Sequence, residues 1–260
     1  MRVDFIGTAS KIAELPVLRH LSPSVNRLVT APEREGYLAC QRLAEKAIKE
    51  IAALVREGWT ERQAARLLNT YLRDCGVHTF FHEAFAWFGE RTRFTGIRRY
   101  RDFLPSERVL REGEVFILDV APIYKGYMCD IGFTASLGPN PLGDRAKAFL
   151  EKLRREIPGW FDGRRRGEEI WNLIDERIGE AGYDNIHEKY PFSVLGHRVH
   201  RIDVDILKLK ILNFGWQSYW SLLSRGLFGQ LLNGNHQGDL VGLWAIEPNI
   251  GTKDFGAKFE

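Results

Sequence analysis

The stretch from Glu114 to Leu137, EVFILDVAPIYKGYMCDIGFTASL, constrains the fold more than any other part of the chain. It holds two apolar runs rich in Val, Ile, Phe and Tyr, and the Lys125-Gly126 pair between them predicts a hairpin with a two-residue turn. Each run carries one carboxylate, Asp119 or Asp130. A carboxylate buried in an apolar strand is costly, so another group must compensate its charge.

The turn also sets the register of this hairpin. Asp119 would face Gly132 and Asp130 would face Ala121, so the two carboxylates would lie on one sheet face as diagonal neighbours roughly 7 Å apart. That separation suits a shared cation. The alternative interpretation is that each acid is a chance charge on an edge strand.

A second hairpin, in WAIEPNIGTKDFGAKFE, carries Glu247 and Glu260. A turn centred on Lys253-Asp254 would place these acids directly opposite each other, which destabilises a sheet unless a cation joins them. Four carboxylates and one histidine would fit two divalent ions, because a single zinc would leave excess negative charge. Two such pairs in one chain make chance charges the weaker explanation.

The composition excludes several classes of protein. The chain has 260 residues, of which 44% are hydrophobic and 27% charged, so it can bury a sizeable core. Its formal charge is +3, and its only dense basic runs, 98–101 and 164–166, are typical of solvated faces and not of a nucleic-acid groove. No run approaches the ~20 apolar residues of a membrane span, and no signal-peptide pattern is present.

The cysteines indicate a reducing compartment. Cys40, Cys75 and Cys129 are widely spaced and odd in number, which argues against a disulfide framework. We therefore expect a cytoplasmic protein. Cys129 precedes Asp130, so it should point to the opposite face and pack in the core.

Helical spacing of apolar residues predicts two helices in the first half, Pro32 to Glu57 and Glu61 to Cys75. Thr60 and Gln63 form a capping box for the second of them. Strands around a Gly89-Glu90 turn should follow, before the hairpin with the aspartates.

Two further helices, 144–157 and 168–180, repeat this order in the second half. The repeat predicts two similar halves with a site between them. Residues 1–30 read as an extended arm. Residues 201–232 are rich in Trp, Tyr, Phe and Leu, and could be extra core, a subunit interface of a homodimer, a lid over the pocket or a segment on a membrane surface.

The order of these acids and histidines resembles the pita-bread metallopeptidases, which include methionine aminopeptidase, aminopeptidase P, prolidase and the metal-free relative creatinase. The matching motifs are LDVAPIYKGYMCD, LGHRVH, AIEPNIG and AKFE. The resemblance begins near Glu33 and implies an α+β pita-bread fold, in which two pseudo-symmetric halves share a curved antiparallel sheet. The catalytic domain would span residues 31–260, with 201–235 as an aromatic insertion.

The resemblance also implies five metal ligands. Asp119 would ligate one ion, Asp130 and Glu260 would bridge both ions, and His197 and Glu247 would complete the second position. The two ions would be manganese, cobalt or iron(II), with zinc as a competitor. They would lower the pKa of a bridging water, so that hydroxide attacks a peptide carbonyl while Glu247 takes the water's proton.

Other histidines are candidates for catalysis and substrate binding. His82 looks like the family histidine that contacts substrate near the scissile amide, although a lone histidine in an aromatic strand is also typical of a core or edge residue, and His78 could share its face. The family's second histidine, seven positions after the first, is Val204 in this chain. His200, as a catalytic group, or His236, as a substrate contact, could replace it, or either could be a surface histidine.

These features predict a dinuclear metal-dependent hydrolase, an aminopeptidase or Xaa-Pro-type peptidase whose partner is a peptide or small amide substrate. A creatinase-like or biosynthetic enzyme acting on a small non-peptide C–N bond is the alternative, because the altered histidine region and the bulky insertion could narrow the pocket. A non-catalytic binding module is a third, and the retention of all five ligand types counts against it.

Overall fold

The computed structural model describes residues 29–95, 97, 100–190, 193–202, 210–211, 213–215, 231–238 and 240–260. The predicted arm, apart from its last two residues, and most of the predicted insertion at 201–235 lie outside the described residues. The interpretations of these two segments, as an extended arm and as an aromatic insertion, therefore stay predictions. Among the helices of the described ranges, none combines the length and the apolar character that crossing a membrane requires.

Two capped helices open the described chain, as the sequence predicts. Helix α3 spans Ala31–Leu54, and helix α4 spans Glu61–Asp74. Thr60 caps α4 through a reciprocal pair of bonds with Gln63: its hydroxyl accepts the Gln63 N–H at 3.2 Å, and its own N–H donates to Gln63 Oε1 at 2.8 Å. Two orphan amides are thereby satisfied.

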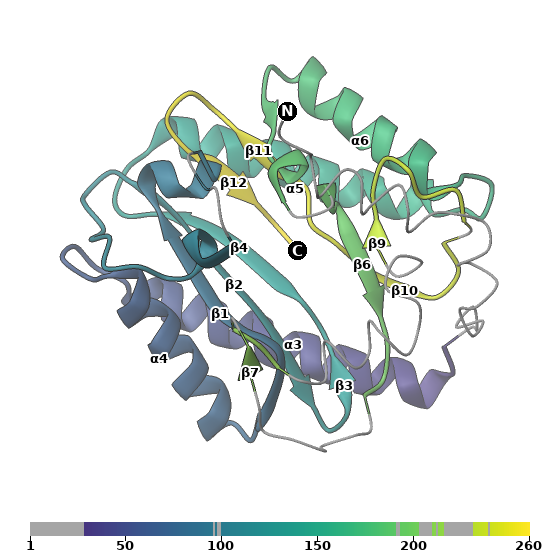
Figure 1. Cartoon of the computed structure of the whole chain (residues 1–260), viewed down its shortest axis with the longest axis horizontal. Helices are drawn as coiled ribbons and strands as arrows, with labels where there is room; N and C mark the ends of the chain where they lie inside the picture. Colours follow the sequence, from purple (N-terminus) through teal and green to yellow (C-terminus); the bar gives the residue numbers. More distant parts are fainter. Residues whose placement is uncertain are drawn as a thin grey trace, which may run out of the picture.

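These helices cover one face of an antiparallel sheet (Figure 1). In the sheet, β3, β2, β1, β8 and β7 lie in that spatial order, and β4 pairs with β2. The bounds of these strands are β1 Thr79–Phe88, β2 Val115–Tyr124, β3 Tyr127–Met128, β4 Ile131–Ser136, β7 Lys210–Ile211 and β8 Phe214–Gly215.

The predicted register of the aspartate hairpin is confirmed. Asp119 pairs with Gly132, and the same register holds in β3 and β4 on either side of Asp130. The turn residues Lys125 and Gly126 have φ of 52° and 83°, the left-handed backbone that a two-residue hairpin turn requires. Cys129 is buried with its Sγ 3.4 Å from Cys40 Sγ, as expected for core packing on the opposite face.

The strand predicted after the Gly89-Glu90 turn is wrong. The chain forms a 3₁₀ helix there, η1 at Gly89–Arg93, and a second one, η2, at Tyr100–Phe103. The Thr92 hydroxyl donates to Gly89 O at 2.6 Å, and Phe94 ends the turn with a left-handed φ of 54°. These local bonds tighten the backbone and override the aromatic alternation that suggested a strand.

The second half repeats the helix pair. Helix α5 spans Pro141–Trp160 and is longer at both ends than predicted. Its earlier start is explained by Asn140, which caps it by accepting the Gly143 N–H at 2.8 Å. Helix α6 spans Gly167–Glu180, close to its predicted bounds. The remaining elements are β5 Asp184–Asn185, η3 His187–Lys189, β6 Gly196–Val199, β9 Leu231–Leu232, β10 Leu243–Ile246, β11 Asn249–Gly251 and β12 Gly256–Lys258.

Two small sheets belong to this half, one with the order β10, β6, β9 and one with the order β12, β11, β5. The register predicted for the second hairpin is confirmed, with Asn249 opposite Lys258 and Gly251 opposite Gly256. Each half has its own apolar cluster, one under α3 and α4 and one between α5, α6 and the short strands. Strands β2, β4 and β12 lie side by side where the halves meet (Figure 1).

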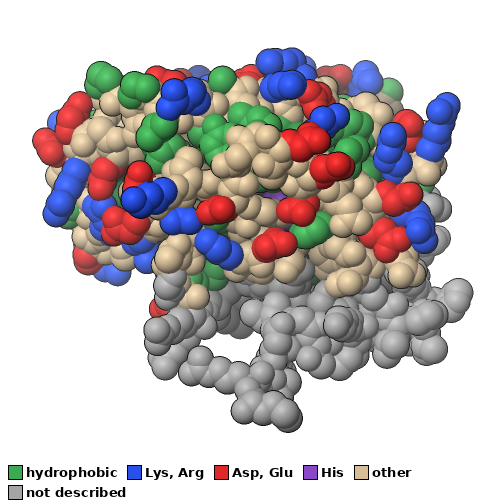
Figure 2. Space-filling view, turned by 90° about the horizontal axis from the view of Figure 1, so that it is seen from above, with side chains coloured by type: hydrophobic (Ala, Val, Ile, Leu, Met, Phe, Trp, Pro, Cys, Tyr) green, Lys and Arg blue, Asp and Glu red, His purple; other side chains and the backbone are tan. Residues whose placement is uncertain are grey.

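The described surface carries mixed charge. On the face in Figure 2, Lys and Arg side chains are interspersed with Asp and Glu side chains. A mixed face of this kind is typical of a solvated surface. The absence of a nucleic-acid partner stays a prediction.

Candidate metal centre

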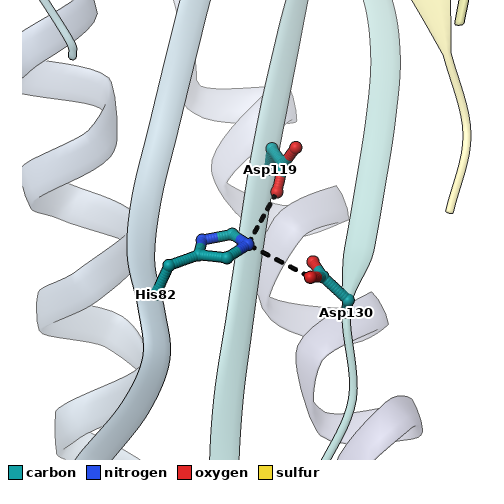
Figure 3. Close-up of side chains that lie close together, drawn as sticks. All are labelled: His82, Asp119 and Asp130. Carbon is teal, nitrogen blue, oxygen red and sulfur yellow. Dashed lines mark hydrogen bonds and ion pairs between the residues drawn. The ribbon is translucent and has the colours of Figure 1, made fainter. Parts of the chain in front are cut away.

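Three buried side chains from the first half form the beginning of the site (Figure 3). His82, on β1, points across β2 toward the two aspartates. Its Nε2 lies 3.1 Å from Asp130 Oδ2 and 3.5 Å from Asp119 Oδ1. The two acids predicted to share a sheet face therefore converge on one imidazole.

A local irregularity of β1 aims this imidazole. The pairing of β1 with β2 shifts register on both sides of His82, between Phe80 and His82 and between His82 and Phe85. Bulges of this kind re-aim side chains next to functional sites. His82 Nδ1 also lies 3.0 Å from Glu83 O, which fixes the ring and directs Nε2 at the acids.

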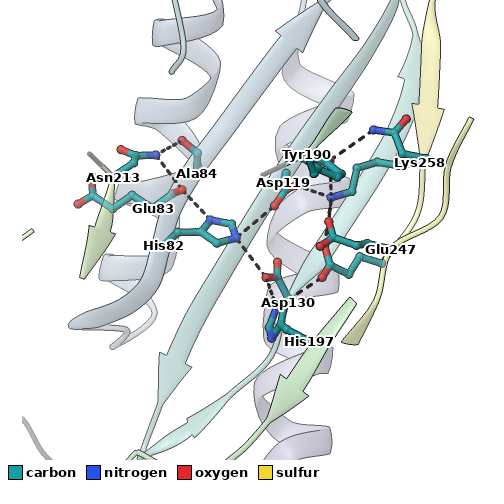
Figure 4. A network of polar contacts seen from close by, with 12 residues as sticks. His82, Glu83, Ala84, Asp119, Asp130, Tyr190, His197, Asn213, Glu247 and Lys258 are labelled. Carbon is teal, nitrogen blue, oxygen red and sulfur yellow. Dashed lines mark hydrogen bonds and ion pairs between the residues drawn. The ribbon is translucent and has the colours of Figure 1, made fainter. Parts of the chain in front are cut away.

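The second half contributes His197 on β6 (Figure 4). Its Nε2 lies 3.0 Å from Asp130 Oδ2 and 3.9 Å from Glu260 Oε1. Its Nδ1 lies 3.3 Å from Arg198 O, and its ring stacks on Phe81 at a centroid distance of 5.3 Å. Both histidines thus use Nδ1 on a backbone carbonyl and present Nε2, an orientation common among metal-binding imidazoles.

The acids and imidazoles shift each other's titration. Burial lowers the pKa of His82, but the Asp130 and Asp119 carboxylates outweigh burial and raise that pKa to about 9. His197 follows the same pattern, and Asp130 raises its pKa against the effect of burial. Burial would raise the pKa of Asp130, yet His82 and His197 together lower it far below its usual range. The two imidazoles therefore favour the ionised form of Asp130.

Lys258 is a buried cation at the centre of the site that the sequence analysis missed. Its Nζ donates to Asp119 Oδ2 at 2.6 Å, Glu247 Oε2 at 2.8 Å and Glu260 Oε2 at 3.2 Å (Figure 4). Burial lowers the pKa of Lys258, but the surrounding carboxylates raise it well above its ordinary value. Lys258 and Glu260 are two positions apart in an extended segment, so the strand period could have identified the lysine as a site residue.

Tyr190 also reaches this lysine and was not predicted. Lys258 Nζ lies 3.4 Å from Tyr190 Oη and 5.6 Å from the centroid of its ring. Burial raises the pKa of Tyr190, so its hydroxyl stays neutral. No local pattern marks this tyrosine, because it follows η3 in a connecting segment.

The other acids of the site are Glu247 and Glu260. Burial raises the pKa of Glu247, and the attraction of Lys258 only partly offsets that effect. Burial and the repulsion of Asp130 raise the pKa of Glu260 well above its usual range. These two carboxyls are therefore short of positive charge even with the lysine present.

The donor set fits a divalent cation. One oxygen of each of three buried acids, Asp119 Oδ1, Asp130 Oδ1 and Glu260 Oε1, has no hydrogen-bond partner among the described residues. Buried carboxylate oxygens rarely remain unpaired without a reason. The ligand atoms of Asp130, His197 and Glu260 lie within 4.8 Å of one another, as do those of the two sets formed by Asp119 with His82 and Asp130, and by Asp119 with Glu247 and Glu260.

Glu61, a buried acid outside the site, provides the contrast. Both of its oxygens accept from Arg91 Nε, at 2.8 and 3.0 Å, and they also accept from the backbone of Phe88 and from Ser106. The fold thus satisfies a structural carboxylate completely. The site oxygens that accept no hydrogen bond from the described residues therefore fit a role as metal ligands better than a structural role.

The remaining predicted histidines lie elsewhere. His236 Nδ1 is 2.8 Å from Leu231 O, and its ring packs edge-on against Trp244 and over Gly167 at the start of α6. His200 is buried just after β6, and neither histidine belongs to the three ligand sets formed by the described residues. His78 is exposed just before β1. The roles predicted for His200 and His236 stay predictions.

Solved structures share this fold. The chain superposes on X-Pro aminopeptidase from Thermotoga maritima with a TM-score of 0.67 and 18% identity, covering 94% of this chain and 59% of that one. For prolidase from Pyrococcus furiosus the TM-score is 0.65 at 18% identity, covering 90% of this chain and 61% of that one. For methionine aminopeptidase from Rickettsia prowazekii the TM-score is 0.62 at 13% identity, covering 90% of this chain and 94% of that one. The predicted α+β pita-bread fold is confirmed.

Sequence comparison identifies the family. The chain is 25% identical over 160 residues to an uncharacterized peptidase of Staphylococcus saprophyticus. The matched region covers 61% of this chain but only 43% of that protein. The chain thus spans less than half of that curated relative, and less than two thirds of the two longer enzymes above. The model of metallopeptidase family M24 matches residues 35–213, and the chain therefore belongs to this family.

Proposed function

We propose that this chain is a metal-dependent aminopeptidase or Xaa-Pro-type peptidase that acts on unblocked peptides or dipeptides. The convergence of two buried imidazoles and four carboxylates, three of them with an oxygen that accepts no hydrogen bond from the described residues, carries the proposal. Membership of the M24 family and the likeness to an X-Pro aminopeptidase, a prolidase and a methionine aminopeptidase support it.

The described residues can share the chemical tasks. Asp130, His197 and Glu260 would hold a divalent cation, which supplies Lewis acidity and lowers the pKa of a coordinated water. The raised pKa of Glu247 suits it to take a proton from the attacking water and to pass it to the leaving amine. His82, fixed by its bond to the backbone, would orient the substrate carbonyl and stabilise the charge that develops on its oxygen.

We propose manganese, cobalt or iron(II) as the metal, because a site of several carboxylates and few imidazoles suits these ions, with zinc as a competitor. The proposed location is the cytoplasm, since Cys40, Cys75 and Cys129 are all free thiols. A homodimer remains the proposed assembly if residues 201–232 form an interface.

A peptide panel tests the proposed activity. The purified protein would be loaded with manganese and incubated with Met-Xaa and Xaa-Pro peptides, with and without an N-terminal block. We expect turnover of unblocked peptides only, loss of turnover with a chelator and recovery when metal is restored. If a metal-loaded protein hydrolyses no unblocked peptide, the proposal is wrong.

A second candidate function is hydrolysis of a small non-peptide C–N bond, by a creatinase-like enzyme. The position of Lys258 among the acids favours it, because the ammonium supplies positive charge to three carboxylates that a metal ion would otherwise neutralise. Small non-peptide amides and guanidino compounds such as creatine belong in the same panel. Their turnover without turnover of peptides would select this alternative.

A further inference from the structure

Lys258 lies where a second metal ion would need to lie. Its ammonium contacts Asp119, Glu247 and Glu260 at 2.6, 2.8 and 3.2 Å, and the same three acids form one of the three ligand sets of the site. Divalent ions of this class bind carboxylate oxygens at about 2.0–2.2 Å, so an ammonium and an ion cannot share these three oxygens.

The strand itself holds the lysine in this position. The Thr134 hydroxyl donates to Lys258 O at 2.7 Å and accepts from Lys258 N at 2.9 Å, which ties β12 to β4 at this residue. The stem of the lysine lies over Gly132, where a Cβ would collide with its Cε. The side chain is fully buried, and Tyr190 closes it off on one side. The lysine side chain therefore lies enclosed inside the protein and not on its surface.

Asp119 and Glu260 each use one carboxylate oxygen for Lys258 and leave the other for a metal ion. Asp119 and Glu260 each give one oxygen, Oδ2 and Oε2, to Lys258. Their other oxygens, Oδ1 and Oε1, have no hydrogen-bond partner among the described residues, and Asp130 Oδ1 is in the same state. Asp119 Oδ1 lies 3.5 Å from His82 Nε2 and Glu260 Oε1 lies 3.9 Å from His197 Nε2, so these two oxygens face the imidazoles while their partner oxygens face the lysine.

We propose that Lys258 permanently takes the position of one of the two ions expected from the sequence, so that the chain binds a single divalent ion at Asp130, His197 and Glu260. The inference depends on the proposed metal dependence of the site. Four carboxylates carry four negative charges and the lysine one positive charge, so one divalent ion would leave these groups with a net charge of −1. A second ion would add a positive centre beside the ammonium, and like charges at such a distance repel strongly.

Counting bound metal tests the inference. Protein loaded with excess manganese and freed of unbound metal by gel filtration should contain about one ion per chain, and Lys258→Gln should contain about two, since the acids then lack their internal cation. Electron paramagnetic resonance should show isolated manganese in the parent and an exchange-coupled pair in the variant. The matched control is Lys253→Gln, which removes the same charge from an exposed position on the same hairpin and should stay near one ion.

Two results would overturn the inference. One is a parent protein with about two coupled ions, and the other is a folded Lys258→Gln variant that still binds only one. Circular dichroism and thermal unfolding establish folding, and Lys258→Met, which keeps an unbranched stem over Gly132, replaces the glutamine variant if that one does not fold.

The count is independent of activity, which separates this inference from the proposed function. A protein with one ion and no turnover would sink the peptidase proposal and leave the lysine assignment standing. An active peptidase with two ions would do the reverse. A parent that binds no metal at all contradicts both.

Discussion

Asp130 is the residue on which the two halves of the site depend most directly. Its Oδ2 is 3.1 Å from His82 Nε2 and 3.0 Å from His197 Nε2, so one oxygen contacts an imidazole from each half. Its other oxygen has no hydrogen-bond partner among the described residues. A neutral side chain of the same shape at this position tests the metal centre with little change in packing.

We therefore expect Asp130→Asn to abolish turnover and to lose bound metal. Loss of an outer-shell partner alone lowers metal affinity by about 10–100-fold, so the loss of a direct ligand should exceed that range. Elemental analysis and peptide turnover check the result, with Asp144→Asn, an exposed aspartate on α5, as the control. Glu260→Gln should behave like Asp130→Asn. Normal metal content in Asp130→Asn would count heavily against its role as a ligand.

His82→Ala should separate metal binding from catalysis. The variant keeps Asp130, His197 and Glu260, so metal should be retained, while the loss of a group that stabilises the reacting carbonyl should lower turnover by about 10²–10³-fold. Metal content and kcat are measured together. His78→Ala, at an exposed position four residues earlier, is the matched control. Full activity in His82→Ala would remove the assigned role.

At the scale of elements, the cap of α4 contributes to stability without contact to the metal ligands. Thr60→Ala removes the hydroxyl that accepts the Gln63 N–H, so the free energy of unfolding should fall by about 1 kcal/mol with turnover unchanged. Urea denaturation measures the difference. Thr95→Ala, at an exposed position outside any helix cap, should leave the midpoint within error. An equal loss in both variants would show that the cap adds nothing.

The secondary-structure elements also show which features of the fold and the site could be predicted from the sequence. Both hairpin registers were predictable, because a short turn determines which residues face each other. Lys258 was not recognised, because a lysine in a short strand usually marks a solvated edge, and here its burial depends on acids from other segments. The 3₁₀ helix at Gly89 was missed because the local bond from the Thr92 hydroxyl to Gly89 O overrides the alternation, and the ion pair of Arg91 with the buried Glu61 on α4 then joins this turn to a segment distant in sequence.

For the whole molecule, His187 should make stability depend on pH. It is fully buried against Trp171, its ring nitrogens have no hydrogen-bond partner among the described residues, and burial lowers its pKa to about 3. The unfolded imidazole, with an ordinary pKa near 6.5, binds a proton that the folded protein excludes. Stability from this group is therefore present above about pH 6.5 and is lost as the pH falls toward 3.

Between pH 7 and pH 5, this one residue should reduce the free energy of unfolding by about 2 kcal/mol. His187→Phe should remove that part of the pH dependence, because an apolar ring of similar size cannot take up a proton. Urea denaturation of both proteins at the two pH values gives the comparison, and the exposed His78→Gln serves as control. Equal pH dependence in parent and His187→Phe would contradict the assignment.

The proposed ligands come from both halves of the molecule, and this has a consequence for how the protein is made. Asp119 and Asp130 belong to the first half, whereas His197, Glu247 and Glu260 follow the second helix pair. With this proposed set, the segment that carries Glu260 must be synthesised and the two halves must dock before an ion could find all of its donors. Metal binding would therefore follow the docking of the two halves, and a bound ion would report that both halves have folded correctly.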